Sequence, residues 1–377
     1  MKTRTTLLTL LALLLVVPFG EASATSKRKG PYDFNKPTRT KQRNHFKLTF
    51  EYTPQYDNNI LKYSDYDVER FDNSTEPNPT PVSSLSDWRN QFALKASRSK
   101  KWFLNKQTTL SATLRWNIWA NSSVLNSNAY WMQWEQEIID PVDFKVAYSL
   151  WKRTPLRSYT DRDTREWHLA QFDQNEYTFR LEVDNPWLQS VTVKPYYQIR
   201  NQYYNEYFTE FDMTGHTSGF DFAYRLFKGS TITAGYEFTS MDNTGRDQSI
   251  GSSVALPVSE DSEYGNASYQ EDELRFDVSS KFVLPKLGDM RWGLDYTYRN
   301  RQYITDNSVS DDPFHAGRSH KFHRVGVEIG GDPIHSTSVT IRVENESRRS
   351  DSPNPNVPKY KDYDATRIAI NLAYRIF

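Results

Sequence analysis

The sequence predicts an all-β chain that closes into a single antiparallel β-barrel of about 14 strands. Three observations lead to this fold class. Apolar residues recur at every second position in many short segments. The connections between these segments are alternately long and short. The last segment, residues 365–377, is an amphipathic strand with nothing after it to pair with. An apolar strand left open at an edge favours aggregation, so we expect it to pair with the first strand.

Residues 1–24 have the pattern of a secretory signal peptide. Lys2 and Arg4 precede an apolar run at 7–19, and the small residues at 22–24 form a cleavage site. A membrane anchor is the alternative, but the run is shorter than the roughly 18 residues that a transmembrane helix needs. We therefore expect cleavage after Ala24 and export of the remaining chain.

Composition excludes several classes of protein. The chain has no cysteine, which excludes a disulfide scaffold, thiol chemistry, Cys-ligated zinc and a lipoprotein anchor. It has 47 basic and 47 acidic residues, so bulk charge indicates no nucleic-acid partner. Residues 25–44 are basic and contain two prolines. We expect a flexible tail there, with contact to a polymer such as peptidoglycan, or a plug inside the barrel, as alternatives.

The two-residue period begins at Phe46. Phe46, Leu48 and Phe50 alternate with Lys47 and Thr49, which is the pattern of a strand with one apolar and one polar face. The same alternation recurs to the end of the chain, although its phase is ambiguous at 129–137. The predicted strands contain residues 46–52, 91–96, 109–118, 129–137, 142–150, 177–183, 191–199, 220–226, 232–238, 274–282, 292–298, 325–329, 339–343 and 365–377.

The connections indicate which kind of barrel this is. The short ones follow the fourth, sixth, eighth, tenth and twelfth strands, whereas the long ones are 53–86, 121–128, 152–166, 201–217, 240–271, 302–320 and 346–363. A soluble sandwich has no reason to place all its long connections at one end. Short turns at one end, long loops at the other and an even number of strands are typical of outer-membrane barrels.

Over residues 45–377 the chain therefore resembles Gram-negative outer-membrane β-barrel proteins of the porin-like class, including an aromatic last residue, Phe377. The resemblance implies a cell outer membrane location, with 25–44 as a periplasmic tail and the long loops outside. It implies contact with outer-membrane lipid and lipopolysaccharide and passage of small hydrophilic solutes. No cofactor is implied, and the oligomeric state stays open.

Aromatic residues make up 15% of the chain. In a transmembrane barrel, aromatic side chains gather in girdles at the two membrane interfaces. We expect such girdles to include Trp116, Trp119, Tyr148, Trp151, Tyr224, Tyr236, Trp292, Tyr298 and Tyr374.

The polar residues between the apolar ones should face the lumen. A barrel of 14 strands is wider than the barrels of about eight strands that side chains fill, so we expect a lumen. Its predicted basic residues are Lys47, Lys95, Arg115, Lys145, Arg180, Lys194, Arg200, Arg225, Arg275, Lys281, Arg299, Arg324, Arg342, Arg367 and Arg375. Its predicted acidic residues are Glu51, Asp143, Glu182, Asp221, Glu237, Asp277, Asp295, Glu328 and Glu344.

This predicted wall has 15 basic against nine acidic residues. Rings of arginine and lysine favour anions. The alternative is that these charges pair across neighbouring strands and hold the wall together.

Two further patterns could carry other chemistry. His216 and Ser218 share a face of a strand, which is the minimum that a barrel hydrolase would need, although no orienting group accompanies them. Acidic loop residues near 57–67 and 260–263 could ligate calcium, but their spacing is not that of an EF-hand. We expect neither catalysis nor a metal site.

The sequence thus predicts a porin-like channel for small hydrophilic solutes, with an anion bias set by the inward arginines and lysines. Three alternatives stay open: a non-conducting barrel with a structural, export or partner-binding role, a barrel hydrolase, and a soluble secreted all-β protein.

Overall fold

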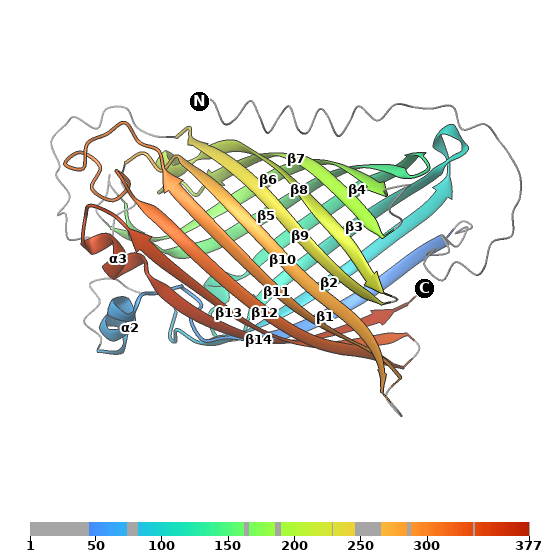
Figure 1. Cartoon of the computed structure of the whole chain (residues 1–377). Helices are drawn as coiled ribbons and strands as arrows, with labels where there is room; N and C mark the ends of the chain where they lie inside the picture. Colours follow the sequence, from blue (N-terminus) through green and yellow to red (C-terminus); the bar gives the residue numbers. More distant parts are fainter. Residues whose placement is uncertain are drawn as a thin grey trace, which may run out of the picture. The chain divides into compact units, whose positions relative to one another are not determined.

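A computed structural model describes residues 45–73, 82–161, 166–184, 190–227, 229–245, 265–284, 288–334 and 336–376. The described chain is dominated by long strands that tilt across a barrel (Figure 1). The strands are β1 (His45–Asp57), β2 (Asp87–Lys101), β3 (Gln107–Trp119), β4 (Ser127–Ile139), β5 (Val142–Thr160), β6 (Trp167–Asp184), β7 (Val191–Tyr204), β8 (Met213–Phe227), β9 (Ser230–Asn243), β10 (Tyr269–Leu284), β11 (Gly288–Tyr303), β12 (Ser319–Ile334), β13 (Thr337–Asp351) and β14 (Tyr363–Arg375).

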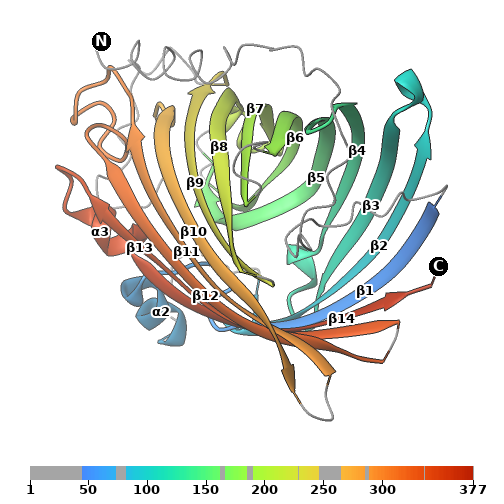
Figure 2. The same ribbon diagram turned by 45° about the vertical axis from the view of Figure 1, so that its right-hand side comes forward.

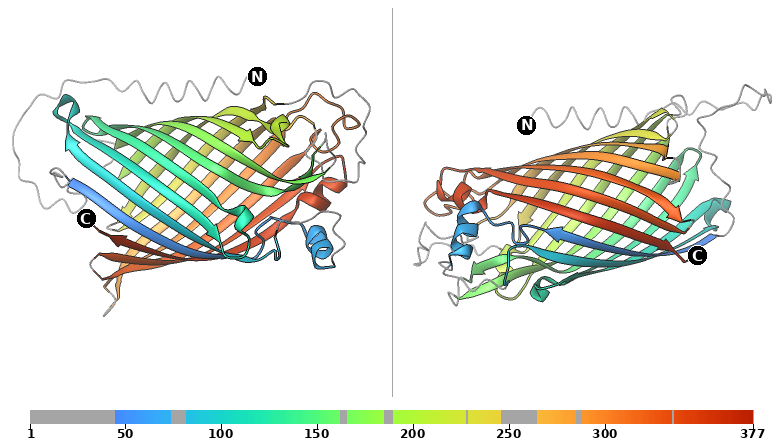
Figure 3. Two further views of the ribbon diagram at one scale, coloured as in Figure 1. Left: turned by 180° about the vertical axis from the view of Figure 1, so that it is seen from behind. Right: turned by 90° about the horizontal axis from the view of Figure 1, so that it is seen from below.

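These fourteen strands form one closed antiparallel barrel in which every strand pairs with its neighbours in the sequence, and β14 pairs with β1. Phe50 of β1 lies opposite Leu94 of β2 on one side and opposite Tyr374 of β14 on the other. The closure is visible from both sides of the barrel (Figures 1 and 3). The predicted fold class and the predicted partner of the last strand are therefore confirmed.

The two faces of the wall differ in chemistry. Large apolar side chains such as Val327, Ile341 and Leu274 are about half exposed on one face, at 53%, 46% and 52%. Their sequence neighbours on the other face form ion pairs that reach across an intervening strand, which the concave inner face of a barrel favours because its side chains converge. The apolar residues therefore face outward, as the alternation predicts.

The two ends of the barrel also differ. At one end lie both termini of the barrel and the short turns, one of which contains the 3₁₀ turn η1 (Phe103–Asn105). At the other end lie the longer connections, with helices α2 (Asp65–Asp72) and α3 (Asn356–Lys361) and the 3₁₀ turns η2 (Ser123–Leu125) and η3 (Thr209–Phe211). Figure 2 looks partly into the barrel and shows α2 and α3 at this looped end. Ser64 caps α2 by accepting a hydrogen bond from the backbone N–H of Asp67.

The strands are longer than their apolar stripes. β5, for example, runs to Thr160, whereas its stripe ends at Leu150. The ladder continues because backbone pairing needs no apolar side chains once a strand has left the hydrocarbon layer. A strand needs only about 9 to 11 residues to cross that layer. The predicted long loops therefore included residues that the structure places in strands, such as residues 152–160 at the end of β5.

No helix among the described residues is long and apolar enough to cross a membrane. The predicted signal peptide, the basic tail, the terminal Phe377 and the acidic stretch at 260–263 lie outside the described residues. They stay predictions.

The assignment of the two faces predicts opposite outcomes for one added charge. Val327→Lys places an ammonium on the outer face at mid-barrel and should lower the free energy of unfolding by about 2–4 kcal/mol in lipid vesicles. Gln133→Lys, also near the middle of its strand but on the inner face beside Glu135, should change it by less than about 1 kcal/mol. Urea titration in vesicles measures both. Equal costs for the two variants would contradict the assignment.

Candidate functional site

The inner wall carries an ion-pair belt around Arg275 on β10. Its guanidinium Nη2 lies 3.0 Å from Asp221 Oδ1 on β8, and Nη1 lies 3.3 Å from Glu237 Oε2 on β9. Nη2 also donates to the hydroxyl of Tyr196 at 2.6 Å, and Tyr196 donates to Glu237 at 2.6 Å. A hydrogen-bonded group of this kind fixes the side chains against the wall.

A second part of the ion-pair belt surrounds Arg342 on β13. Its guanidinium makes a two-pronged contact with Asp295 on β11, with N–O distances of 2.6 and 3.0 Å. It also lies 3.0 Å from Glu344 Oε2. Glu344 in turn accepts from Arg367 on β14 at 2.8 Å, and Arg367 continues to Asp57 on β1 at 2.8 Å. The belt therefore crosses the seam where the barrel closes.

Glycines make these long contacts possible. The contact between Arg342 and Asp295 passes over Gly326, which lies between them on β12. A Cβ atom at Gly326 would lie 2.3 Å from Arg342 Nη2 and 2.5 Å from Asp295 Oδ1. At Gly235, on the strand between Arg275 and Asp221, a Cβ would lie 2.6 Å from that carboxylate. Since real Cβ atoms do not approach so closely, a side chain at either position would displace the ion pair.

The structure brings together most of the predicted lumen charges. Ion pairs involve the predicted basic residues Lys95, Lys145, Arg180, Lys194, Arg200, Arg275, Arg299, Arg342 and Arg367. They also involve the predicted acidic residues Glu51, Glu182, Asp221, Glu237, Asp295, Glu328 and Glu344. The strand register places the remaining predicted members on the same face: Lys47, Arg115, Asp143, Arg225, Asp277, Lys281, Arg324 and Arg375.

Sequence reasoning missed six acidic residues that pair with these cations. They lie beyond the ends of the apolar stripes or in the strand of ambiguous phase, where the alternation gave no orientation: Asp57, Glu135, Glu176, Glu271, Glu273 and Glu346. It also missed the inward cations Arg89 and Arg301. The predicted excess of 15 basic over nine acidic residues therefore does not describe the whole wall.

The wall of β2 to β5 is built differently, as a basic–aromatic arc. Arg115 lies over the ring of Trp131, with its Cζ 4.5 Å from the ring centroid. Trp131 packs edge-to-face against Trp151, with centroids 4.9 Å apart and planes at 81°. Arg89 lies over Trp119 at 5.8 Å and donates to Gln55. Neither arginine has an ion pair among the described residues, and the Nε atoms of both are buried without a hydrogen-bond partner there.

The basic–aromatic arc corrects two predicted girdle residues. Trp119 lies opposite Arg89, and Trp151 lies opposite Ala129, so both are on the inner face. Trp119 comes directly after the outward Ile118, and Trp151 comes directly after the outward Leu150. Successive residues of a strand point to opposite faces, so both tryptophans point inward. The other predicted girdle residues lie on the outer face: Trp116, Tyr148, Tyr224, Tyr236, Trp292, Tyr298 and Tyr374.

The looped end of the barrel is partly covered. Arg157 of β5 donates to Asp67 of α2 at 3.0 Å and to the backbone oxygen of Tyr360 in α3 at 2.9 Å. Four strands, β1 to β4, separate β5 from β14 in the barrel order, so these contacts reach across the entrance. Tyr66 of α2 also packs edge-to-face on Tyr360, at 5.4 Å. The two helices thus narrow the outer entrance.

The hydrolase pattern has no supporting geometry. His216 and Ser218 both lie exposed on the outer face of β8, opposite Ile199 and Tyr197 of β7. His216 stacks near the ring of Tyr197, with centroids 6.0 Å apart. Within the part of the chain that the structure describes, no hydrogen bond joins His216 to Ser218 or to a carboxylate.

The acidic loop residues near 57–67 serve as structural partners. Asp57 binds Arg367, and Asp67 binds Arg157. No group of three or more potential metal ligands occurs among the described residues.

No protein-family model matches the chain, and no curated protein matches its sequence. Several solved barrels resemble its structure. OprD from Pseudomonas aeruginosa is 12% identical, with 89% of this chain and 94% of that chain covered and a TM-score of 0.38. OpdK from the same organism is 11% identical, with 88% and 99% covered and a TM-score of 0.40. CdiB from Acinetobacter baumannii is 12% identical, with 87% and 60% covered and a TM-score of 0.41.

The resemblance to outer-membrane barrels as a class is confirmed by the closed fourteen-stranded architecture and by its apolar outer face.

Adding one methyl group at Gly326 tests whether this glycine makes room for the ion pair between Arg342 and Asp295. Gly326→Ala should lower the free energy of unfolding by about 1–3 kcal/mol, because the new Cβ overlaps the Arg342–Asp295 pair. In an Arg342→Ala background the same change should cost less, because the nearest overlapping atom is gone. Urea unfolding of the four proteins in a double-mutant cycle measures the coupling. Additive effects would show that the glycine is not required for this contact.

Proposed function

We propose that this chain is an outer-membrane channel for small hydrophilic solutes. The observation that carries the proposal is the polar inner wall of a closed fourteen-stranded barrel with an apolar outer face. The wall is lined with charges fixed in pairs rather than with packed apolar side chains. Barrels of about eight strands are filled by their own side chains, whereas wider barrels leave room for water and solutes.

We further propose that the selectivity of the channel comes from the basic–aromatic arc rather than from the total number of cations. Arginines in the ion-pair belt are neutralised by carboxylates 2.6 to 3.3 Å away. Arg89 and Arg115 have no ion pair among the described residues, and the guanidinium of each lies over a tryptophan ring instead. An anionic solute on this side of the lumen would meet positive charge that no ion pair among the described residues neutralises.

A non-conducting barrel is the second candidate, and the narrowed entrance favours it. The contacts of Arg157 with α2 and α3 hold the loops across the lumen. Such a barrel would serve a structural, export or partner-binding role through its loops. Nothing in the site favours a catalytic role, and we propose none.

Single-channel conductance tests the proposal directly. The refolded chain, starting at residue 25, is inserted into a planar bilayer under a salt gradient. Steady conductance with a reversal potential that favours anions is the expected result. Neutralising Arg115 and Arg89 to glutamine should lower the ratio of anion to cation permeability by about two-fold, since salt screens each single charge in a wet lumen.

Lys321→Gln is the matched control. Lys321 lies exposed on the outer face of β12, so its removal should leave the reversal potential unchanged. Silence at all voltages would overturn the channel and support the non-conducting barrel. If Lys321→Gln changed the selectivity as much as Arg89→Gln and Arg115→Gln together, the proposed role of the basic–aromatic arc would be wrong.

A further inference from the structure

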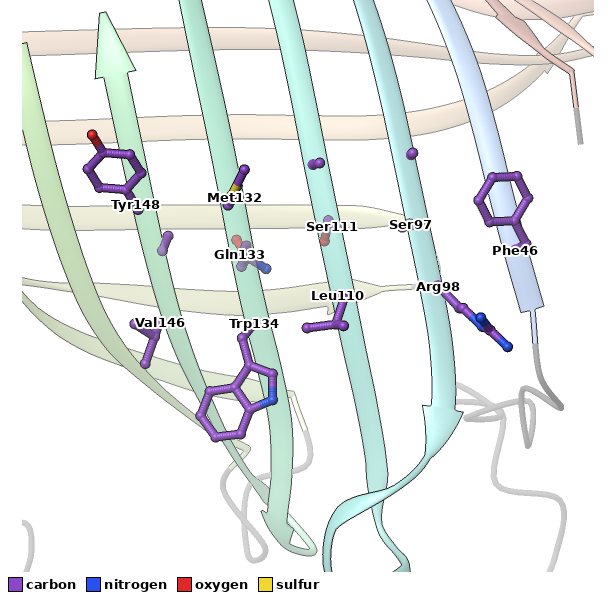
Figure 4. Close-up of a pocket in the computed structure, with 13 residues that line it drawn as sticks. Phe46, Ser97, Arg98, Leu110, Ser111, Met132, Gln133, Trp134, Val146 and Tyr148 are labelled. Carbon is purple, nitrogen blue, oxygen red and sulfur yellow. The ribbon is translucent and has the colours of Figure 1, made fainter.

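The outer face has a hollow that is separate from the lumen and from the entrance. It lies over β1 to β5, has a volume of about 500 Å³ and is almost entirely apolar. Its side chains include Phe46, Ala96, Ala112, Met132, Trp134 and Tyr148. Figure 4 shows Phe46 at one edge of the hollow and Trp134 and Tyr148 toward the other. We call it the outer groove.

The strand register explains why the wall is hollowed here. Ala96 of β2 lies opposite Ala112 of β3, so two methyl groups stand side by side on the outer face at this level. Met132 continues this row on β4, and Tyr148 continues it on β5. Met132 is 64% exposed and Phe46 is 50% exposed, so these large side chains form the sides of the groove, and the small side chains of Ala96 and Ala112 form its floor.

Positive charge borders the outer groove at one end. Arg98 lies one pleat beyond Ala96 on the outer face of β2, opposite Phe46 and Leu110. It is exposed and has no ion pair among the described residues. Lys100 follows on the same face, one pleat nearer to the end of β2. Figure 4 shows Arg98 close to that strand end. This is the end with the short turns, which faces the periplasm in an outer-membrane barrel.

We propose that the outer groove binds one anionic phospholipid of the periplasmic leaflet. An acyl chain would lie over Ala96 and Ala112, and its phosphate would be held by Arg98 and Lys100. This inference rests on the proposed placement of the barrel in the outer membrane, but not on conduction.

Apolar contact alone does not distinguish this site from the surrounding lipid, because lipid tails are as apolar as the wall. Selectivity must come from close packing in the hollow and from the cations. Many dispersion contacts add up where a chain fits a groove, and basic side chains beside a membrane bind anionic head groups. An apolar groove with cations at its periplasmic end therefore fits a lipid better than a soluble ligand.

Native mass spectrometry of the refolded barrel in detergent tests the proposal with phosphatidylglycerol and phosphatidylcholine as probes. We expect the wild type to bind one phosphatidylglycerol about five-fold more tightly than phosphatidylcholine, as one effective cation would give. Arg98→Gln should reduce this preference, and the double variant Arg98→Gln/Lys100→Gln should remove it. Ala112→Leu, which raises the floor of the outer groove, should weaken binding of both lipids.

Two variants on other parts of the outer face serve as matched controls. Lys321→Gln removes a cation near the looped end. Ala234→Leu enlarges an exposed alanine that lies between Phe222 and Phe276, outside the outer groove. Both should bind the two lipids as the wild type does.

Equal binding of the two lipids by the wild type would overturn the proposal. Equal effects of the groove variants and their controls would do the same. A dimer that Ala112→Leu disrupts would show that the groove contacts a second copy, which also contradicts lipid binding. A barrel that binds phosphatidylglycerol but is silent in bilayers would overturn the channel alone, whereas a chain that does not insert into membranes would overturn both.

Discussion

The whole structure depends on closing the backbone hydrogen-bond ladder. In hydrocarbon, each unpaired backbone group costs several kcal/mol, so a membrane-spanning sheet cannot keep an open edge. Pairing of β14 with β1 removes both edges at once. Every strand then has one face toward lipid and one toward the interior, and the side chains must follow the two-residue period of the backbone. The apolar outer face and the charged inner wall are both consequences of this closure.

Closure also bends the wall, and this curvature determines which charged side chains come close enough to pair. On the concave face, side chains of next-nearest strands approach one another if the strand between them offers a glycine. Gly235 and Gly326 do this for the pairs around Arg275 and Arg342, so these charges are neutralised on the wall itself. The arc of β2 to β5 has tryptophans in place of carboxylates beside its arginines. Charge on the inner wall is therefore unevenly distributed, and it is on this asymmetry that the proposed selectivity rests.

The sequence predicted what depends on local periodicity and failed where structure is non-local. Thirteen of the fourteen predicted segments lie within observed strands, and the last, 365–377, coincides with β14 up to Arg375, because alternation is imposed by the lipid-facing half of each strand. Orientation was lost at 129–137, where aromatic residues such as Tyr130 and Trp131 occupy both faces. The acids Glu271 and Glu346 were missed because they lie where strands continue beyond their apolar stripes. The bridge from Arg157 to α2 and α3 could not be foreseen, since no local pattern relates residues that are 90 and 203 positions apart.

A channel requires that the inner wall of the barrel face water. Because the chain has no native cysteine, single cysteines can report this along β3 in proteoliposomes. Ser111 and Thr113 face inward, whereas Ala112 and Leu114 face outward. A membrane-impermeant thiol reagent should modify cysteines at the two inward positions and spare the two outward ones. Protection of all four positions would mean that no water-filled lumen reaches mid-barrel, and labelling of the outward pair alone would mean that the two faces have been assigned the wrong way round.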